Sequence, residues 1–241
     1  MNNYLSLLVV FFISFACVNS SEKKSEDNIA NIDKNEWEVL FDGGNVDKWK
    51  GKTESNFPEK GWVIEDGLLF LAEKGGGDII TKEKYSDFEL VFQFMLTERA
   101  NSGIKYYVDT LVNQETGQIM INGHEYQIID DYNNVEVKDD PNGVSSSAFV
   151  YLLYAPVNKK LNRHDEWNTG RIVSKNGLVG HWLNGIKVVE YQRGSKDFLE
   201  KRSETKFKDV KNYGELKSGH ILITDHNDKV YFKDVKIRRL L

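Results

Sequence analysis

Two polar side chains suited to binding a hydroxylated molecule occur close together in the stretch GHEYQIIDD, residues 123–131. If this stretch is a β-strand, successive side chains alternate between its two faces. Glu125 and Gln127 then share one face, while Tyr126 and Ile128 share the other. A carboxylate accepts hydrogen bonds and can take up a proton, and an amide both donates and accepts. The pair therefore suits the recognition of sugar hydroxyls, with a titratable group beside them.

Aromatic residues expected nearby favour the same interpretation. The segments SAFVYLLY and GHWLNG are predicted to be further strands, and they carry Tyr151, His181 and Trp182 among apolar neighbours. Aromatic rings stack on the apolar C–H faces of sugars. The simpler alternative is that Glu125 and Gln127 belong to the ordinary solvated face of a strand in a sandwich.

The sequence lacks the motifs of several common enzyme classes. It has no G-x-S-x-G nucleophile elbow, no phosphate-binding glycine loop and no H-E-x-x-H zinc helix. The GGGD stretch at 75–78 precedes an expected strand and is interpreted as a loop. No pair among the five histidines has the spacing of a strong metal motif. A net charge of −5 gives no electrostatic support for nucleic-acid binding.

Turn signals and alternating apolar residues predict an antiparallel all-β fold around these candidates. Asp66-Gly67, Asn176-Gly177 and Asn184-Gly185 are favoured two-residue hairpin turns. In FELVFQFML, residues 88–96, every second side chain is a large apolar one, so this strand should place one face on a core. Evenly spaced strands without alternating helices indicate a sandwich or barrel.

Other segments are less regular. We expect polar, turn-rich loops at 109–122 and 131–147 and one short helix within 195–209. GHILITD and KVYFKDVKIRRL are predicted to be the last two strands, with a turn at Asn227-Asp228.

The N-terminal segment differs in composition from the rest of the chain. Residues 1–17 contain a short apolar run that ends at Cys17, with Ala16 before it, and they resemble a bacterial lipoprotein signal with its lipobox. A plain secretory signal is the alternative. Residues 18–36 are polar and charged, as in a flexible tether, and residues 37–241 are predicted to form a single domain. We therefore expect export across the inner membrane and a lipid anchor at Cys17 in the cell envelope, facing the periplasm or lying in the outer membrane.

An ordered set of short motifs resembles the 3-keto-disaccharide hydrolase domain family. The matching pieces extend from LFDGGNVDKWKG to the C-terminus, across roughly residues 37–241, and include NSGIKYYV, HEYQIIDD, EWNTGRIV and HWLNGIKVVEY. The resemblance implies a concanavalin A-like, jelly-roll β-sandwich. This chain has Lys105 where the family usually has Arg, and Thr224 where it usually has Gln.

The resemblance also implies an activity, the cleavage of 3-keto-glycosides through loss of the C2 proton, β-elimination and hydration. In that chemistry Glu125, Lys105 and His226 are the catalytic candidates. The substrate-binding candidates are Gln127, Tyr151, Trp167, Asn168, His181 and Asp225. The cofactor is left open, with a divalent metal ion as one candidate for polarising the ketone oxygen. An oxidoreductase that forms the 3-keto group is the expected upstream partner.

Two other functions remain open at this point. A non-catalytic carbohydrate-binding module would use the same polar and aromatic face, since fold alone does not decide function. A structural or adhesive lipoprotein would use it only as a solvated surface. Titratable groups that converge on one point, namely Glu125, Lys105 and His226, favour the enzyme.

Overall fold

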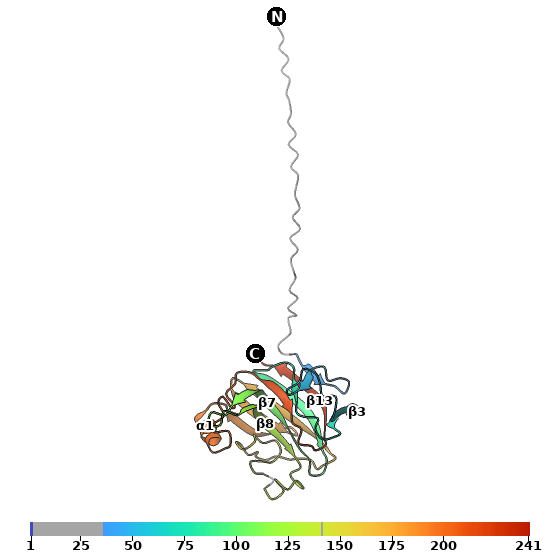
Figure 1. The fold of residues 1–241 in the computed structure, drawn as a ribbon, viewed down its shortest axis with the longest axis vertical. Coiled ribbons are helices and arrows are strands. Elements are labelled where there is room, and N and C mark those ends of the chain that lie inside the picture. Colours follow the sequence, from blue (N-terminus) through green and yellow to red (C-terminus); the bar gives the residue numbers. More distant parts are fainter. Residues whose placement is uncertain (2–35, 141) are drawn as a thin grey trace. The chain divides into compact units, whose positions relative to one another are not determined.

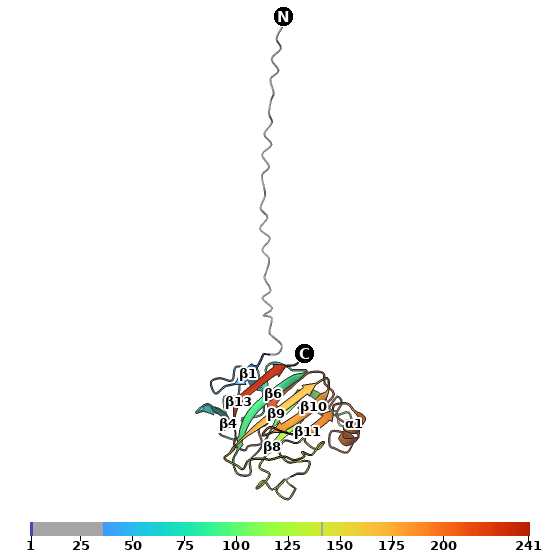
Figure 2. The same cartoon turned by 180° about the vertical axis from the view of Figure 1, so that it is seen from behind.

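The computed structural model describes Met1, residues 36–140 and residues 142–241. The strands between residues 38 and 239 form two stacked antiparallel sheets. Figure 1 views the molecule from the side of β7 and β8, and Figure 2 from the side of β6, β9, β10 and β11. Apart from Met1 and Glu36, the predicted signal, Cys17 and the predicted tether lie outside the described residues. The only helix of the described part, α1 (Lys196–Ser203), is too short to cross a bilayer.

The larger sheet has eight strands. Its order is β11 (Ile186–Gln192), β10 (Leu178–Leu183), β9 (Trp167–Lys175), β6 (Phe88–Leu96), β13 (Val230–Arg239), β4 (Leu68–Leu71) and β3 (Trp62–Glu65), and β1 (Glu38–Phe41) also pairs with β13. The smaller sheet has the order β2 (Trp49–Gly51), β5 (Ile79–Thr81), β12 (His220–Ile223), β7 (Asn101–Val112) and β8 (Ile119–Ile129). The all-β sandwich expected for a jelly roll is confirmed.

The three predicted hairpins are present because their turn residues adopt the required positive φ. Asn176 and Gly177 have φ values of 52° and 79°, and Asn184 and Gly185 have 49° and 81°. Asp66-Gly67 joins β3 to β4 in the same way. These values match type I′ turns, whose twist suits two-residue hairpins.

The core lies between the sheets and is formed by alternate residues of their strands. The predicted apolar face of β6, with Phe88, Leu90, Phe92, Phe94 and Leu96, is fully buried. Tyr126 and Ile128 of β8 also have no exposed surface, so the other face of β8 points away from the core. This alternation places Glu125 and Gln127 on the outer face of the smaller sheet.

Two expectations were wrong. Residues 109–122 are largely strand, because β7 and β8 extend as a long hairpin with a turn between Val112 and Ile119. SAFVYLLY forms turns instead of a strand, since Ala148 and Leu152 have positive φ. The predicted final two strands are present as β12 and β13, and they belong to different sheets.

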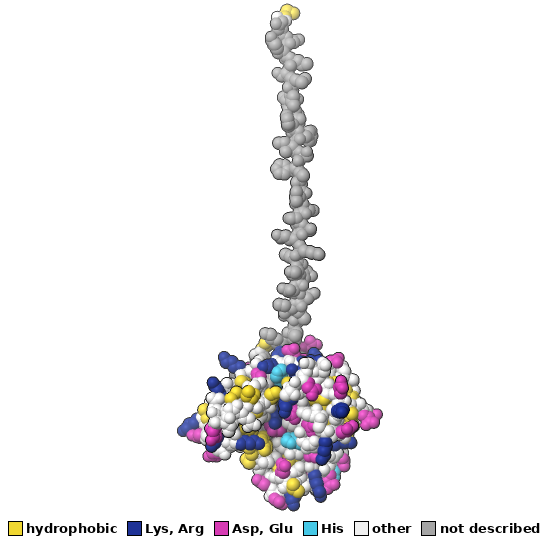
Figure 3. Space-filling view, viewed as in Figure 1, with side chains coloured by type: hydrophobic (Ala, Val, Ile, Leu, Met, Phe, Trp, Pro, Cys, Tyr) yellow, Lys and Arg dark blue, Asp and Glu magenta, His cyan; other side chains and the backbone are white. Residues whose placement is uncertain are grey.

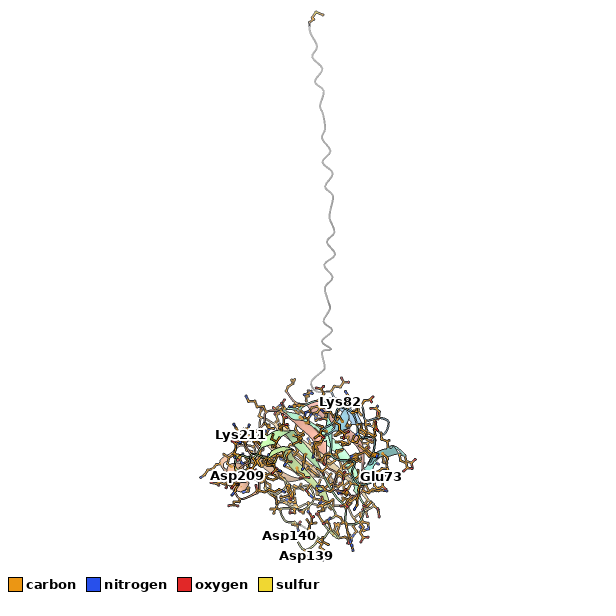
Figure 4. The ribbon with its side chains drawn as sticks, viewed as in Figure 1. Glu73, Lys82, Asp139, Asp140, Asp209 and Lys211 are labelled. Atoms are coloured by element: carbon orange, nitrogen blue, oxygen red, sulfur yellow. The ribbon has the colours of Figure 1, made fainter. Side chains whose placement is uncertain are left out.

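The remaining predictions for the loops and the helix are confirmed. Residues 131–147 are turn-rich, and Asp139 and Asp140 lie at the far end of this loop (Figure 4). Helix α1 begins after Ser195, whose side chain accepts a hydrogen bond from the backbone N–H of Phe198.

Candidate functional site

The candidate site is built on the paired strands β7 and β8. Lys105 lies directly opposite Glu125, and their Nζ and Oε2 atoms are 3.7 Å apart. Directly opposite residues of an antiparallel pair share a face, so this face joins the predicted carboxylate and the predicted cation. Figure 3 shows basic, acidic and histidine side chains gathered around a hollow over β7 and β8.

Glu125 has the environment of a reactive carboxyl group. It is only 6% exposed, and burial raises its pKa above the ordinary glutamate value. The charges of Lys105 and His226 oppose that rise. Its Oε1 atom is buried and has no hydrogen-bond partner. An unpartnered buried acceptor is costly in a resting protein, and such atoms occur where a ligand or reacting proton is expected.

Gly103 provides the space that Glu125 occupies. A Cβ atom on Gly103 would overlap Glu125 Oε1, and the φ of this glycine is not positive. The backbone carbonyl of Gly103 accepts a hydrogen bond from the N–H of Thr224 at 3.0 Å, which joins β7 to the end of β12. The glycine of the NSGIK motif is therefore explained by the position of the Glu125 carboxylate.

Gln127 is held by a neighbour that sequence reasoning missed. Its Nε2 donates to Asn101 Oδ1 at 2.8 Å, and the Asn101 backbone N–H donates to Asp228 Oδ2 at 2.9 Å. The side chains of Gln127 and Asn101 are both almost fully buried. The amide of Gln127 is therefore oriented before any ligand arrives.

Asp225 shapes the turn that carries His226. Its carboxylate accepts the N–H groups of Gly77 and Asn227, each at 2.7 Å. The Asp225 N–H donates to Asp78 Oδ1 at 2.9 Å, and Lys52 Nζ lies 2.6 Å from Asp78 Oδ2. Asp225, predicted to bind substrate, thus has both carboxylate oxygens engaged by the backbone. The exposed His226 is close enough to Glu125 for its positive charge to lower the pKa of that carboxyl group.

One wall of the site comes from segments beyond the two sheets. The backbone N–H of Tyr151 donates to the Glu125 carbonyl at 3.2 Å. Lys206, in the segment after α1, places Nζ 4.8 Å from the centre of the Tyr151 ring. The negative charge of Glu125 contributes to the raised pKa of the buried Tyr213, which burial itself raises most. This wall combines an aromatic surface with a second lysine.

Three predicted substrate-binding residues lie elsewhere, in the larger sheet. Trp167 is opposite Met95 on the outer face of that sheet, with Lys233 Nζ 3.9 Å from the ring centre. Asn168 is buried and accepts hydrogen bonds from Asn162 and Asn184. Neither residue joins the Glu125 face.

His181, the third of these residues, is part of a buried chain of hydrogen bonds between the two sheets. Its Nδ1 lies 3.0 Å from the Ala148 carbonyl and its Nε2 lies 2.9 Å from Tyr106 Oη. Tyr106 contacts Tyr191, which bonds His124 Nδ1. Because a carbonyl only accepts, a neutral His181 donates from Nδ1. Its burial, which lowers its pKa to about 4, keeps it neutral at pH 7. The side chain of His181 therefore lies in the core and does not face the site.

The predicted metal ion has no evident ligand set in the part of the chain that the structure describes. No three or more His, Cys, Asp or Glu side chains there are arranged to hold a metal. The divalent metal therefore stays a prediction from the sequence, and the chemistry below is derived from protein groups alone.

The site residues that were not predicted from the sequence differ in how recognisable their sequence surroundings are. Asn101 lies in the NSGIK motif, and Asp78 ends the GGGD stretch, whose composition indicates only a loop. Lys206 is one of several lysines in a charged, irregular segment, so its position had no signal in the sequence. Only the tertiary structure brings it to Tyr151 and Glu125.

Comparisons with known proteins identify the family of this chain. The model of a family described as 3-keto-alpha-glucoside-1,2-lyase-like domain matches residues 36–238. A protein of Bacteroides thetaiotaomicron named 3-keto-disaccharide hydrolase is 28% identical over 233 residues, covering 87% of this chain and 80% of the relative.

Solved structures of relatives share the fold. A crystal structure described as a putative glycosyl hydrolase from Parabacteroides distasonis has a TM-score of 0.71 at 31% identity, covering 85% of this chain and 94% of that one. A second structure with the same description and source has a TM-score of 0.63 at 28% identity, covering 86% and 100%.

Proposed function

Because the chain belongs to the family of 3-keto-alpha-glucoside-1,2-lyase-like domains, we propose that it is a glycoside-cleaving enzyme that acts on 3-keto-glycosides. The observation that carries this proposal is the carboxyl group of Glu125. It is buried, it has one unpartnered oxygen, its pKa is raised, and a lysine ammonium lies 3.7 Å away. Sugar binding alone does not require a carboxyl group of this kind.

The chemistry begins at the carbon next to the ketone. A ketone at C3 acidifies the C2 proton, since removal of that proton gives an enolate. Glu125 accepts the proton, and the electron pair forms a C1–C2 double bond as the bond from C1 to the glycosidic oxygen breaks. That oxygen leaves with a proton. Water then adds its hydroxyl to C1 and a proton to C2, so the net reaction is hydrolysis. A base is more effective when its pKa lies near the pH of the reaction, and burial raises the pKa of Glu125 in that direction.

Two further groups suit the remaining steps. Lys105 supplies a fixed positive charge beside Glu125, where it would stabilise the negative charge that develops on the enolate oxygen. His226 is exposed at the edge of the site and is the candidate acid for the leaving oxygen. Gln127, oriented by Asn101, is the candidate for binding a sugar hydroxyl.

The direct test is incubation of the purified protein with phenyl 3-keto-α-glucoside, with and without a chelator, and measurement of released phenol. We expect release that depends on the protein, and no release from phenyl α-glucoside, which lacks the ketone. Binding of both compounds without release from either would favour the carbohydrate-binding module. Phenol release that is lost when the chelator is present would indicate that the reaction needs the predicted metal ion.

Gly103→Ala tests the position of the Glu125 carboxyl group. The added Cβ would displace Glu125 Oε1, and misplacement of a reacting group by about 1 Å can cost roughly 100-fold in rate. We expect turnover to fall by about that factor while the circular dichroism spectrum stays unchanged.

Gly51→Ala in the same sheet is the matched control. Its Cβ would meet the side chain of Glu54, which is exposed and can move. Equal turnover in both variants would show that the space at Gly103 is irrelevant to the reaction.

The upstream part of the proposal follows from the substrate. A 3-keto-glycoside must be supplied by an oxidoreductase that oxidises the C3 hydroxyl. Attachment to the cell envelope through Cys17 stays a prediction of the sequence.

A further inference from the structure

Two lysines, Lys105 and Lys206, lie close enough to Glu125 for their charges to act on it. The Glu125 carboxylate faces Lys105 at 3.7 Å, and Asp78 is paired with Lys52 at 2.6 Å. Lys206 is an additional cation, and its charge also acts on Glu125.

Lys206 is directed toward the site by an aromatic contact. Its Nζ lies 4.8 Å from the centre of the Tyr151 ring and 5.4 Å from that of Phe207. Phe207 stacks on the buried Tyr213, with ring centres 4.0 Å apart. Within the described residues, Lys206 has no carboxylate within 4 Å, unlike the neighbouring Lys208, which faces Asp209 at 3.8 Å.

We propose that Lys206 selects substrates that carry a negative charge, such as a carboxylate, close to the bond that is cleaved, a proposal that rests on the function given above. A cation at the edge of a partly closed site attracts anions and orients them, and it favours charged ligands over neutral ones of the same shape. The ring of Tyr151 holds the Lys206 ammonium group in place, separately from Lys105, which lies beside Glu125. The substrate class is thus acidic 3-keto-glycosides.

The test compares neutral and acidic substrates of matched shape. Phenyl 3-keto-α-glucoside is the neutral probe. One acidic probe has a carboxylate on the phenyl group, and the other has a carboxylate at C6 of the sugar. We expect at least one acidic probe to have a KM lower by roughly threefold to tenfold. This preference should shrink as the salt concentration rises.

Two variants separate selection from general effects. Lys206→Met should abolish the preference for the acidic probe, whereas Lys208→Met should retain it. The ratio of the two KM values is the readout, because loss of Lys206 also changes the surroundings of Glu125 for every substrate. An equal KM for neutral and acidic probes in the parent protein would overturn the inference and leave the proposed function intact.

Binding measurements test the proposed charge selection by Lys206 even if the protein cleaves none of these compounds. Calorimetric titration with phenyl α-glucoside and with its two acidic counterparts reports affinity alone. Tighter binding of an acidic compound that is lost in Lys206→Met would support the charge selection. Equal affinities would contradict it, whatever the outcome for the reaction.

Discussion

Replacing Glu125 with Gln is expected to lower the turnover of 3-keto-glucosides by about 10²- to 10⁴-fold, the usual contribution of a positioned general base. Glutamine keeps the shape and most of the hydrogen-bonding capacity of the side chain but cannot take the C2 proton. The strand pairing of β7 with β8 does not involve the carboxylate, so the fold should persist. Single-turnover kinetics and a circular dichroism spectrum measure the two parts of this expectation.

The same substitution should stabilise the protein at neutral pH. The pKa of Glu125 is raised in the folded state by burial, so its contribution to stability is present at low pH and is lost as the pH rises through that pKa. Relative to the parent, Glu125→Gln should therefore gain stability above the raised pKa and lose that gain in acid. Denaturant unfolding of both proteins across this pH range measures the difference.

Glu115→Gln is the control, since Glu115 is exposed in the turn of the same hairpin. It should change neither turnover nor the pH dependence of unfolding. A Glu125→Gln variant that folds and turns over substrate like the parent would remove Glu125 from the mechanism.

Lys159→Met is expected to destabilise the protein by about 3–5 kcal/mol, because it leaves a buried carboxylate without its partner. Lys159 Nζ lies 2.6 Å from Asp131 Oδ2, and the two side chains are only 5% and 4% exposed. Asp131 Oδ1 accepts the backbone N–H of Ser147 at 2.8 Å. Asp131 follows the end of β8, so this pair joins the 131–147 loop and the segment around Lys159 to the site strand.

The effect should be specific to the unpaired charge. A buried ion pair replaced as a unit is often neutral in its effect on stability, so Asp131→Asn combined with Lys159→Met should recover most of the loss. Lys138→Met in the same loop is the control, because Lys138 and Asp139 are exposed and 3.9 Å apart, and it should cost less than about 1 kcal/mol. Denaturant unfolding of the four proteins measures these differences. Equal losses for Lys159→Met and Lys138→Met would contradict the assignment.

The sequence predicts those parts of the fold that local chemistry determines. Asn-Gly and Asp-Gly turns specify hairpins, and the alternation in β6 and β8 assigns their buried faces. The same alternation places Glu125 and Gln127 together, which is why the centre of the candidate site could be located. Both signals need only neighbouring residues.

The failures concern features that depend on tertiary contacts. SAFVYLLY has the composition of a strand, yet Ala148 and Leu152 adopt positive φ where the segment turns against β8. His181 is polar, but its hydrogen bonds to Ala148 and Tyr106 let it enter the core. Asp78 and Lys206 reach the site only through folding of distant segments.

Side chains alternate between the two faces of β8, so one strand carries residues with two different roles. Tyr126 and Ile128 determine how the sheets pack, whereas Glu125 and Gln127 determine what the outer face can bind. The side chains of these two sets point to opposite faces of the strand. Substitutions of Glu125 or Gln127 can therefore change what the outer face binds without repacking the core between the sheets. A protein on this scaffold can thus acquire a new specificity through coupled changes on the outer face, at Glu125, Gln127 and their partners, while the packing of the sandwich stays the same.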